Sequence, residues 1–145
     1  MGLISQRRKF FFDCLAYLEI DFYMYSAAFI FEPGDYDEEF YLLDNQIHEI
    51  ADSIEGFLGR ESWQTTDGKR INATYYWQDK SALKMFSMHP RHIEAKRQYK
   101  KWYKGFHVVI SEIQQSYGDG FFPHITPNSR SNDGAGQAPT QAPAR

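Results

Sequence analysis

Residues 72–103, NATYYWQDKSALKMFSMHPRHIEAKRQYKKWY, decide how this chain folds. The stretch opens with a predicted strand, because Tyr75 and Trp77 alternate with Thr74 and Tyr76. A period of two places alternate side chains on opposite faces of a sheet. The rest of the stretch is predicted to form two short helices that meet at a proline, so most of the aromatic and basic side chains that could face a ligand fall within it.

The two helices are placed by a cap and by the proline. Asp79 is suited to cap a helix that begins near Lys80, because its side chain accepts hydrogen bonds from free N–H groups of the first turn. Pro90 disfavours helix at the residue before it and suits the first position of a new helix. The second helix is therefore predicted to begin at Pro90 or Arg91. Its apolar stripe is predicted to run at helical spacing through Ala95, Tyr99, Trp102 and Phe106.

The same reasoning places the other elements of the chain. They are a first strand at 22–31 buried on both faces, a helix capped by Asp35 or Asp37 and ended by Gly56, a strand at 57–65, a hairpin turn at Asp67 and Gly68, and a last strand at 106–117. The order β-α-β-β-α-α-β predicts an α+β domain with a four-stranded antiparallel sheet and helices on one face. The bare face of such a sheet predicts a homodimer.

The chain of 145 residues is predicted to consist of three segments. Residues 22–118 form the predicted domain. Residues 1–21 are an N-terminal extension with three open interpretations: an amphipathic helix packed on the domain, a segment that touches a membrane, or a leader upstream of a start at Met24. Residues 119–145 are a C-terminal tail predicted to be mostly disordered, since its last part has Gly, Pro, Ala and Gln with no apolar period.

Composition limits the function classes. A formal net charge of -3 and a pI near 5.9 argue against a dedicated nucleic-acid binder. The single cysteine, Cys14, excludes an internal disulfide framework and favours a cytoplasmic location. No stretch is long and apolar enough to predict a membrane span. Aromatic residues make up 17% of the chain, which favours a subunit interface or an aromatic pocket beside the core.

The chain also resembles a known family. The run YYWQDKSALKMFSMHPRHIEAKRQYKKWYKGFHVVISEIQQSYG at 75–118, with EGFLGRESW at 55–63, resembles the antibiotic biosynthesis monooxygenase family of small dimeric α+β proteins. The resemblance covers residues 24–118. It implies a ferredoxin-like fold that dimerises through its sheet face, and a cofactor-independent monooxygenase acting on a small aromatic or polyketide-like substrate. Relatives in the superfamily include haem-degrading enzymes and members with no known activity, so fold alone does not fix the chemistry.

A site is expected between the sheet and the helices. His92 is the leading general base, because its ordinary pKa lies near neutrality. Lys96 is the cation that would hold a substrate anion, and Trp77 completes the predicted catalytic set by shaping the cavity. The alternative interpretation, which the residue types favour, is that His92 orients the two helices at the proline corner and that Trp77 and Trp102 belong to the core. The predicted substrate-binding residues are Tyr25, Trp63, Tyr75, Phe86, His89, Tyr99, Trp102 and Tyr103.

No nucleotide or flavin cofactor is expected, because no nucleotide or phosphate-binding motif is present. No metal site is expected either, because the corner at Pro90 leaves no helical i, i+4 pair of ligands among His89, His92 and Glu94. Haem is an alternative, but haem-degrading relatives carry a Trp where this chain has Phe86 and an axial His where it has Lys96. A further alternative is a non-catalytic dimeric domain that binds a small ligand or responds to stress. Pocket volume separates these hypotheses, since a catalytic site reached by His92 needs room for a substrate. The sequence does not identify the substrate.

Overall fold

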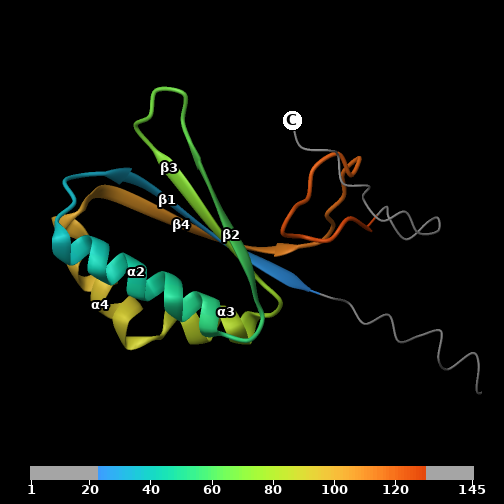
Figure 1. Ribbon diagram of the computed structural model, residues 1–145, viewed down its shortest axis with the longest axis horizontal. Helices are drawn as coiled ribbons and strands as arrows, with labels where there is room; N and C mark the ends of the chain where they lie inside the picture. The colour runs from blue at the N-terminus through green and yellow to red at the C-terminus, as the bar shows by residue number, and fades with distance from the viewer. Residues whose placement is uncertain (1–22, 130–145) are drawn as a thin grey trace, which may run out of the picture.

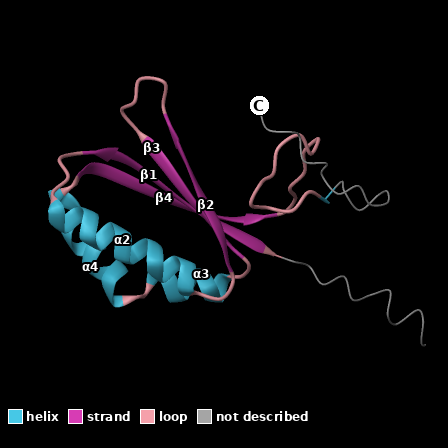
Figure 2. Ribbon diagram, in the orientation of Figure 1, coloured by secondary structure: helices cyan, strands magenta, loops and turns pink. Residues whose placement is uncertain are grey.

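The computed structural model describes residues 23–129, so the predicted extension at 1–21 and the last part of the predicted tail lie outside the described residues. Figures 1 and 2 show one sheet with helices against one of its faces. The elements are β1 (Met24–Pro33), α2 (Glu38–Ser53), β2 (Phe57–Gln64), β3 (Ile71–Trp77), α3 (Lys80–Ser87), α4 (Pro90–Gln98), a 3-10 turn (Tyr99–Lys101) and β4 (Tyr103–Ile113).

The sheet is antiparallel throughout, with the strand order β2-β3-β1-β4. This order and the helices on one face confirm the predicted α+β, ferredoxin-like fold. Tyr25 lies opposite Trp77 and Ala27 opposite Tyr75, so these four side chains share the face that the helices cover. Thr65 donates its N–H to Arg70 across the predicted hairpin, and Gly68 adopts the positive φ of 69° that the turn needs.

Both predicted aspartate caps are present. An Oδ1 of Asp37 accepts the N–H of Phe40 at 2.8 Å, and an Oδ1 of Asp79 accepts the N–H of Ala82 at 2.8 Å. These caps fix where α2 and α3 begin, and both helices then turn their apolar sides toward the sheet. The main core lies there, formed by Ala51, Trp77, Ala82, Leu83 and Phe86.

The predicted apolar stripe along the second helix is wrong beyond Gln98. The helix α4 ends at Gln98, and Phe106 lies on β4 instead of on a helix. The Trp102 carbonyl accepts the N–H of Gly34 at 2.7 Å, so strand-like pairing with the segment after β1 begins there. A run of aromatic and β-branched residues follows, which favours a strand and overrides the helical spacing.

The strand β1 is half-buried along its whole length, which corrects the prediction that both its faces are buried. The reason is that one face of the sheet carries no helix (Figure 1). Part of that face is covered by the chain segment after β4: Ile125 contacts Gly59, and the ring of His124 packs on Tyr76. We call residues 116–128 the C-terminal strap. Thr126 of the strap is buried.

The edge strand β4 leaves apolar side chains exposed. Phe106, Val108 and Ile110 lie on its helix-side face and Val109 on the other, each at least 41% exposed. An exposed apolar edge of this kind favours contact with another chain. Within residues 23–129, none of the helices has the length and apolar character that crossing a membrane requires.

Candidate functional site

The candidate site is the corner where α3 gives way to α4. Pro90 takes the first position of α4, and His89 precedes it as the cap: its Nδ1 accepts the N–H of Arg91 at 3.2 Å. One turn further along α4, the side chain of His92 points back to the end of α3, and its Nδ1 lies 3.3 Å from the carbonyl oxygen of Ser87. The proline corner therefore determines where His92 lies.

Burial and hydrogen bonding set the protonation state of His92. Burial lowers its pKa to about 4, and the positive charge of Lys96 acts in the same direction. At neutral pH the ring is therefore uncharged. Because the carbonyl oxygen of Ser87 can only accept a hydrogen bond, Nδ1 carries the proton and donates it. Nε2 then holds the free lone pair, which can accept a hydrogen bond or a proton.

Lys96 binds the same residue as His92. Its Nζ donates to the Ser87 carbonyl at 2.8 Å and lies 3.0 Å from the Ser87 hydroxyl. Burial lowers the pKa of Lys96. The structure thus brings the predicted base and the predicted cation together on one helix end, with Ser87 between them.

Ser87 is not among the residues predicted from the sequence. It is the last residue of α3, and the final carbonyls of a helix have no partner within the helix. A histidine and a lysine that follow a helix end by five and nine residues are the signal that could have identified it.

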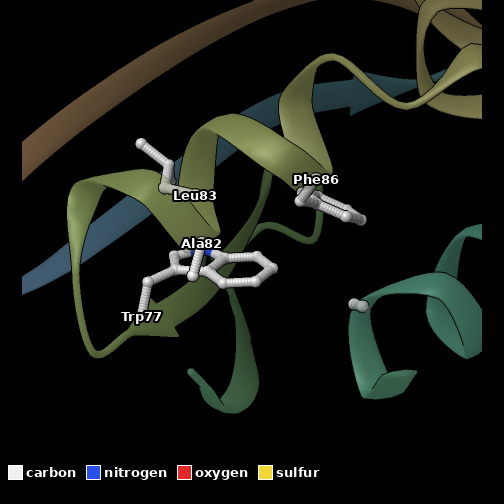
Figure 3. Packing of buried hydrophobic residues seen from close by; sticks show 5 residues of the cluster. Trp77, Ala82, Leu83 and Phe86 are labelled. Atoms are coloured by element: carbon white, nitrogen blue, oxygen red, sulfur yellow. The ribbon is translucent and has the colours of Figure 1, made fainter. Parts of the chain in front are cut away.

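Aromatic residues fill the space beside His92. The Phe86 ring lies 4.5 Å from the His92 ring, 5.5 Å from Tyr75 and 5.1 Å from Trp77. Figure 3 shows Trp77 lying beneath α3, with Ala82, Leu83 and Phe86 around it. Burial raises the pKa of Tyr75 to about 12, so its hydroxyl stays protonated. Five predicted site residues are therefore brought together: Tyr75, Trp77, Phe86, His92 and Lys96.

A second aromatic cluster holds other predicted residues. Trp102 is buried against Phe40, and its Nε1 donates to Asp37 at 3.0 Å. Tyr103 packs beside Phe40, and burial raises its pKa above the ordinary tyrosine value. A cavity of about 30 Å³ lies in this region, lined by residues of α2 and α4 together with Trp102 and Tyr103. It has room for a water molecule and not for a substrate.

The remaining predicted substrate-binding residues lie apart from His92 or at its margin. Tyr99 packs edge-on against Phe106 at 4.9 Å. The hydroxyl of Tyr25 donates to Glu112 at 3.1 Å, although its ring borders the main core. Trp63 is 67% exposed and lies on the face of the sheet without helices. His89 is engaged as the cap of α4. The structure therefore does not gather these four around one cavity.

The family was established by comparison of the sequence. Residues 35–111 match the model of the family described as monooxygenase af470-like. The chain belongs to this monooxygenase family. The match spans the chain from α2 to α4 and most of β4, and so includes the whole corner that holds His92 and Lys96. Comparison with curated proteins gives no match.

Solved structures share the fold. SnoaB of Streptomyces nogalater, a cofactor-independent oxygenase, superposes with a TM-score of 0.54 at 13% identity, over 64% of this chain and 95% of its own. Rv0793 of Mycobacterium tuberculosis gives 0.52 at 12% identity, over 67% and 99%. A Nitrosomonas europaea protein assigned as an antibiotic biosynthesis monooxygenase gives 0.51 at 15% identity, over 62% and 89%. The family match confirms the resemblance to a monooxygenase family, and at these identities the structural likeness shows the fold alone.

Proposed function

We propose that this family member is a cofactor-independent monooxygenase that oxidises a small aromatic or polyketide-like substrate at the α3–α4 corner. The observation that carries the proposal is the neutral ring of His92, whose Nδ1–H lies on the Ser87 carbonyl and whose lone pair is therefore on Nε2. Membership of a monooxygenase family and the fold shared with SnoaB support the same reaction class.

In the proposed reaction the substrate itself supplies the electrons. Nε2 of His92 takes a proton from a phenol or enol, and Lys96 stabilises the resulting anion. The electron-rich anion then reacts with dioxygen: the substrate loses two hydrogens, one oxygen atom forms the new carbonyl, and the other leaves as water. An anion beside Nε2 favours the protonated ring, so substrate binding raises the pKa of His92 above its depressed value in the free protein.

The residues present do not fit haem. Lys96 occupies the position of the axial histidine in haem-degrading relatives, and a lysine binds iron only when neutral. Its Nζ instead donates hydrogen bonds to the carbonyl and hydroxyl of Ser87. Within residues 23–129, no three His, Cys, Asp or Glu side chains are grouped to bind a metal ion. We therefore propose a reaction that uses no iron.

A second candidate function is a non-catalytic domain that binds a small ligand. It is favoured by the packing of Tyr75, Trp77 and Phe86 on one another, since these side chains fill the region that a substrate would need. Under this hypothesis His92 and Lys96 orient the corner by hydrogen bonding to the Ser87 carbonyl at the end of α3. Catalysis instead requires that the Phe86 ring move aside when a substrate binds.

We also propose that the protein acts as a homodimer. The exposed apolar side chains of β4 and the part of the helix-free face that the C-terminal strap leaves uncovered would be buried by a second copy. The proposed partners are thus a small-molecule substrate and a second copy of the chain. A cytoplasmic location stays a prediction.

The test combines nitrogen NMR of the histidine rings with oxygen uptake. At pH 7 we expect His92 to show a protonated Nδ1 and a bare Nε2, and both signals to move when a reactive phenol or quinol is added. Oxygen should be consumed in a one-to-one ratio with product. His92→Gln should lower that rate by about a hundredfold.

His48→Gln is the matched control, because His48 lies on α2 and pairs with Asp44 away from the corner. It should leave the rate unchanged. A His92 signal that responds to no ligand, together with no oxygen uptake across a panel of phenols and quinols, would replace the oxygenase proposal with the binding-domain hypothesis.

A further inference from the structure

The C-terminal strap has an exposed aromatic tip on a closed base. At the base, the Asn128 side chain accepts the N–H of Gly118 at 3.2 Å and donates to the Gly118 carbonyl at 3.0 Å. A surface loop whose ends lie this close together is compact. At the tip, Phe121 is 90% exposed and Phe122 is 69% exposed. Two adjacent phenyl rings in solvent favour burial against a partner.

Local contacts orient the tip. An Oδ1 of Asp119 accepts the N–H of Phe121 at 3.0 Å, and Gly120 between them has a positive φ of 81°. Further along the strap, Ile125 packs on Gly59 and so fixes the strap to the sheet. Asp119 is exposed and is the acidic residue of the strap. The tip therefore presents two phenyl rings and one negative charge.

A hollow with room for these rings lies on the same face of the sheet. Its volume is about 450 Å³, in the size range of sites that hold drug-sized molecules. On this face Ile30 lies opposite His107 and Glu32 opposite Gly105. Gly105 contributes no side chain, and a Cβ built on it meets nothing within 4 Å. The floor of the hollow is therefore flat and open.

The charges of the hollow are complementary to those of the tip. Arg70 and Lys104 line the hollow together with Glu32, whose Oε1 lies 4.0 Å from the Lys104 Nζ. The guanidinium of Arg70 makes no ion pair among residues 23–129, so one positive charge is left over from these three side chains. An arginine binds a carboxylate with two parallel hydrogen bonds, so Arg70 suits the carboxylate of Asp119.

The strap and the hollow lie at opposite ends of the helix-free face (Figure 1). The strap packs over Tyr76, which pairs with Ser26, and Glu32 of the hollow lies roughly 20 Å further along β1. In a dimer whose sheets face each other, the two-fold axis lies between the sheets. An axis that crosses the strands reverses their direction, so the strap end of each protomer faces the hollow end of its partner.

We propose that the C-terminal strap docks in the hollow of a second copy of this chain. Phe121 and Phe122 of one protomer fill the hollow of its partner, and Asp119 pairs with Arg70 of the partner subunit. The rings cover Gly105, as aromatic side chains do when they stabilise a glycine in an edge strand. The contact is made twice, because a two-fold interface is isologous. It rests on the homodimer proposed above and names the residues that hold that dimer together.

The direct test is an isotope-filtered NOE spectrum of the full chain, recorded on dimers mixed from carbon-13-labelled and unlabelled protein. We expect cross-peaks between protomers, from the ring protons of Phe121 and Phe122 to the methyl groups of Ile30 and the α protons of Gly105. Absence of these cross-peaks in a protein that light scattering shows to be dimeric would overturn the proposal.

Substitution of the tip tests its contribution to dimerisation. The double variant Phe121→Ser with Phe122→Ser should raise the dimer Kd at least about a hundredfold, because four buried phenyl rings are lost from each dimer. Both side chains are exposed within one chain, so the variant should stay folded, which amide dispersion checks. Leu42→Ser is the matched control, because Leu42 is an exposed apolar residue on α2, and it should leave the Kd unchanged.

A double-mutant cycle tests the charge pair. Asp119→Asn keeps an oxygen that can accept the N–H of Phe121 but removes the charge, and Arg70→Gln removes the opposite charge. Each should raise the dimer Kd about fivefold, and both together also about fivefold, because they remove the same contact. Lys69→Gln is the control, since Lys69 is an exposed cation on the same hairpin that does not line the hollow. Effects that multiply in the double variant would contradict this pairing.

Failure of the strap contact can be told apart from failure of the homodimer. A wild-type chain that light scattering shows to be monomeric at every concentration would overturn both proposals. A dimer that keeps its Kd when both phenylalanines are replaced by serine would overturn the strap contact and leave the homodimer standing. Neither result depends on whether the protein consumes oxygen.

Discussion

The two buried tryptophans, Trp77 and Trp102, allow a test of how much a hydrogen bond to a buried indole N–H contributes to the free energy of unfolding. Trp77 is 0% exposed, and its Nε1 has no hydrogen-bond partner among the described residues. Trp102 is 2% exposed, and its Nε1 donates to Asp37. Replacing either by Phe removes the same atoms, so the difference between the variants reports on the N–H group. We expect Trp77→Phe to cost much less stability than Trp102→Phe.

The magnitudes follow from volume and hydrogen bonding. Each change removes roughly 40 Å³, and a residual cavity costs about 24 cal/mol per Å³, or about 1 kcal/mol. Lost apolar burial adds about 1 kcal/mol. At Trp102 the lost hydrogen bond adds about 1 kcal/mol more, for a total of about 3 kcal/mol. At Trp77 removal of an unsatisfied N–H returns about 1–2 kcal/mol, so the net cost is about 0–1 kcal/mol.

Urea unfolding followed by circular dichroism measures both free energies of unfolding, provided that the slopes with urea agree between the variants. Trp63→Phe is the control, because Trp63 is largely exposed and the change should cost less than about 0.5 kcal/mol. The reasoning is refuted if Trp77→Phe costs as much as Trp102→Phe. That result would mean that the Nε1 of Trp77 has a partner, such as a bound water, in solution.

Three further predictions concern pH, the strap and two glycines. Since the pKa of His92 falls to about 4 on folding, the unfolded chain binds more protons below pH 6.5. Stability should therefore fall as pH drops from about 6.5 to 4, by on the order of 3 kcal/mol, and His92→Gln should flatten that slope in acid unfolding curves. Ile125→Ala should speed amide hydrogen exchange across residues 116–128 while leaving α2 protected, and equal exchange in wild type and variant would show that Ile125 does not anchor the strap. Gly34→Ala should lower the melting temperature, because its Cβ would lie 2.9 Å from the Trp102 carbonyl oxygen, whereas Gly105→Ala meets open space and should not; equal effects would contradict this contrast.

Local signals were enough to predict most of the fold. Asp37 and Asp79 cap their helices because a short acidic side chain satisfies free N–H groups wherever a helix starts. Pro90 fixes the start of α4 for a similarly local reason, because the backbone of proline suits the first position of a helix. The end of α4 could not be predicted in this way, because the pairing of Trp102 with Gly34 depends on a segment distant in the sequence.

For the candidate site, the sequence by itself determined the residue types and tertiary structure decided their chemistry. A histidine and a lysine after a proline corner are visible in the sequence, but the pKa of His92 and its tautomer depend on burial and on the Ser87 carbonyl. The position of Trp63 on the helix-free face was likewise not predictable, because alternation gives two faces of a strand without saying which face the helices cover. Local hydrogen bonds such as helix caps depend on residues close in the sequence, whereas the burial of a side chain depends on how the whole chain packs.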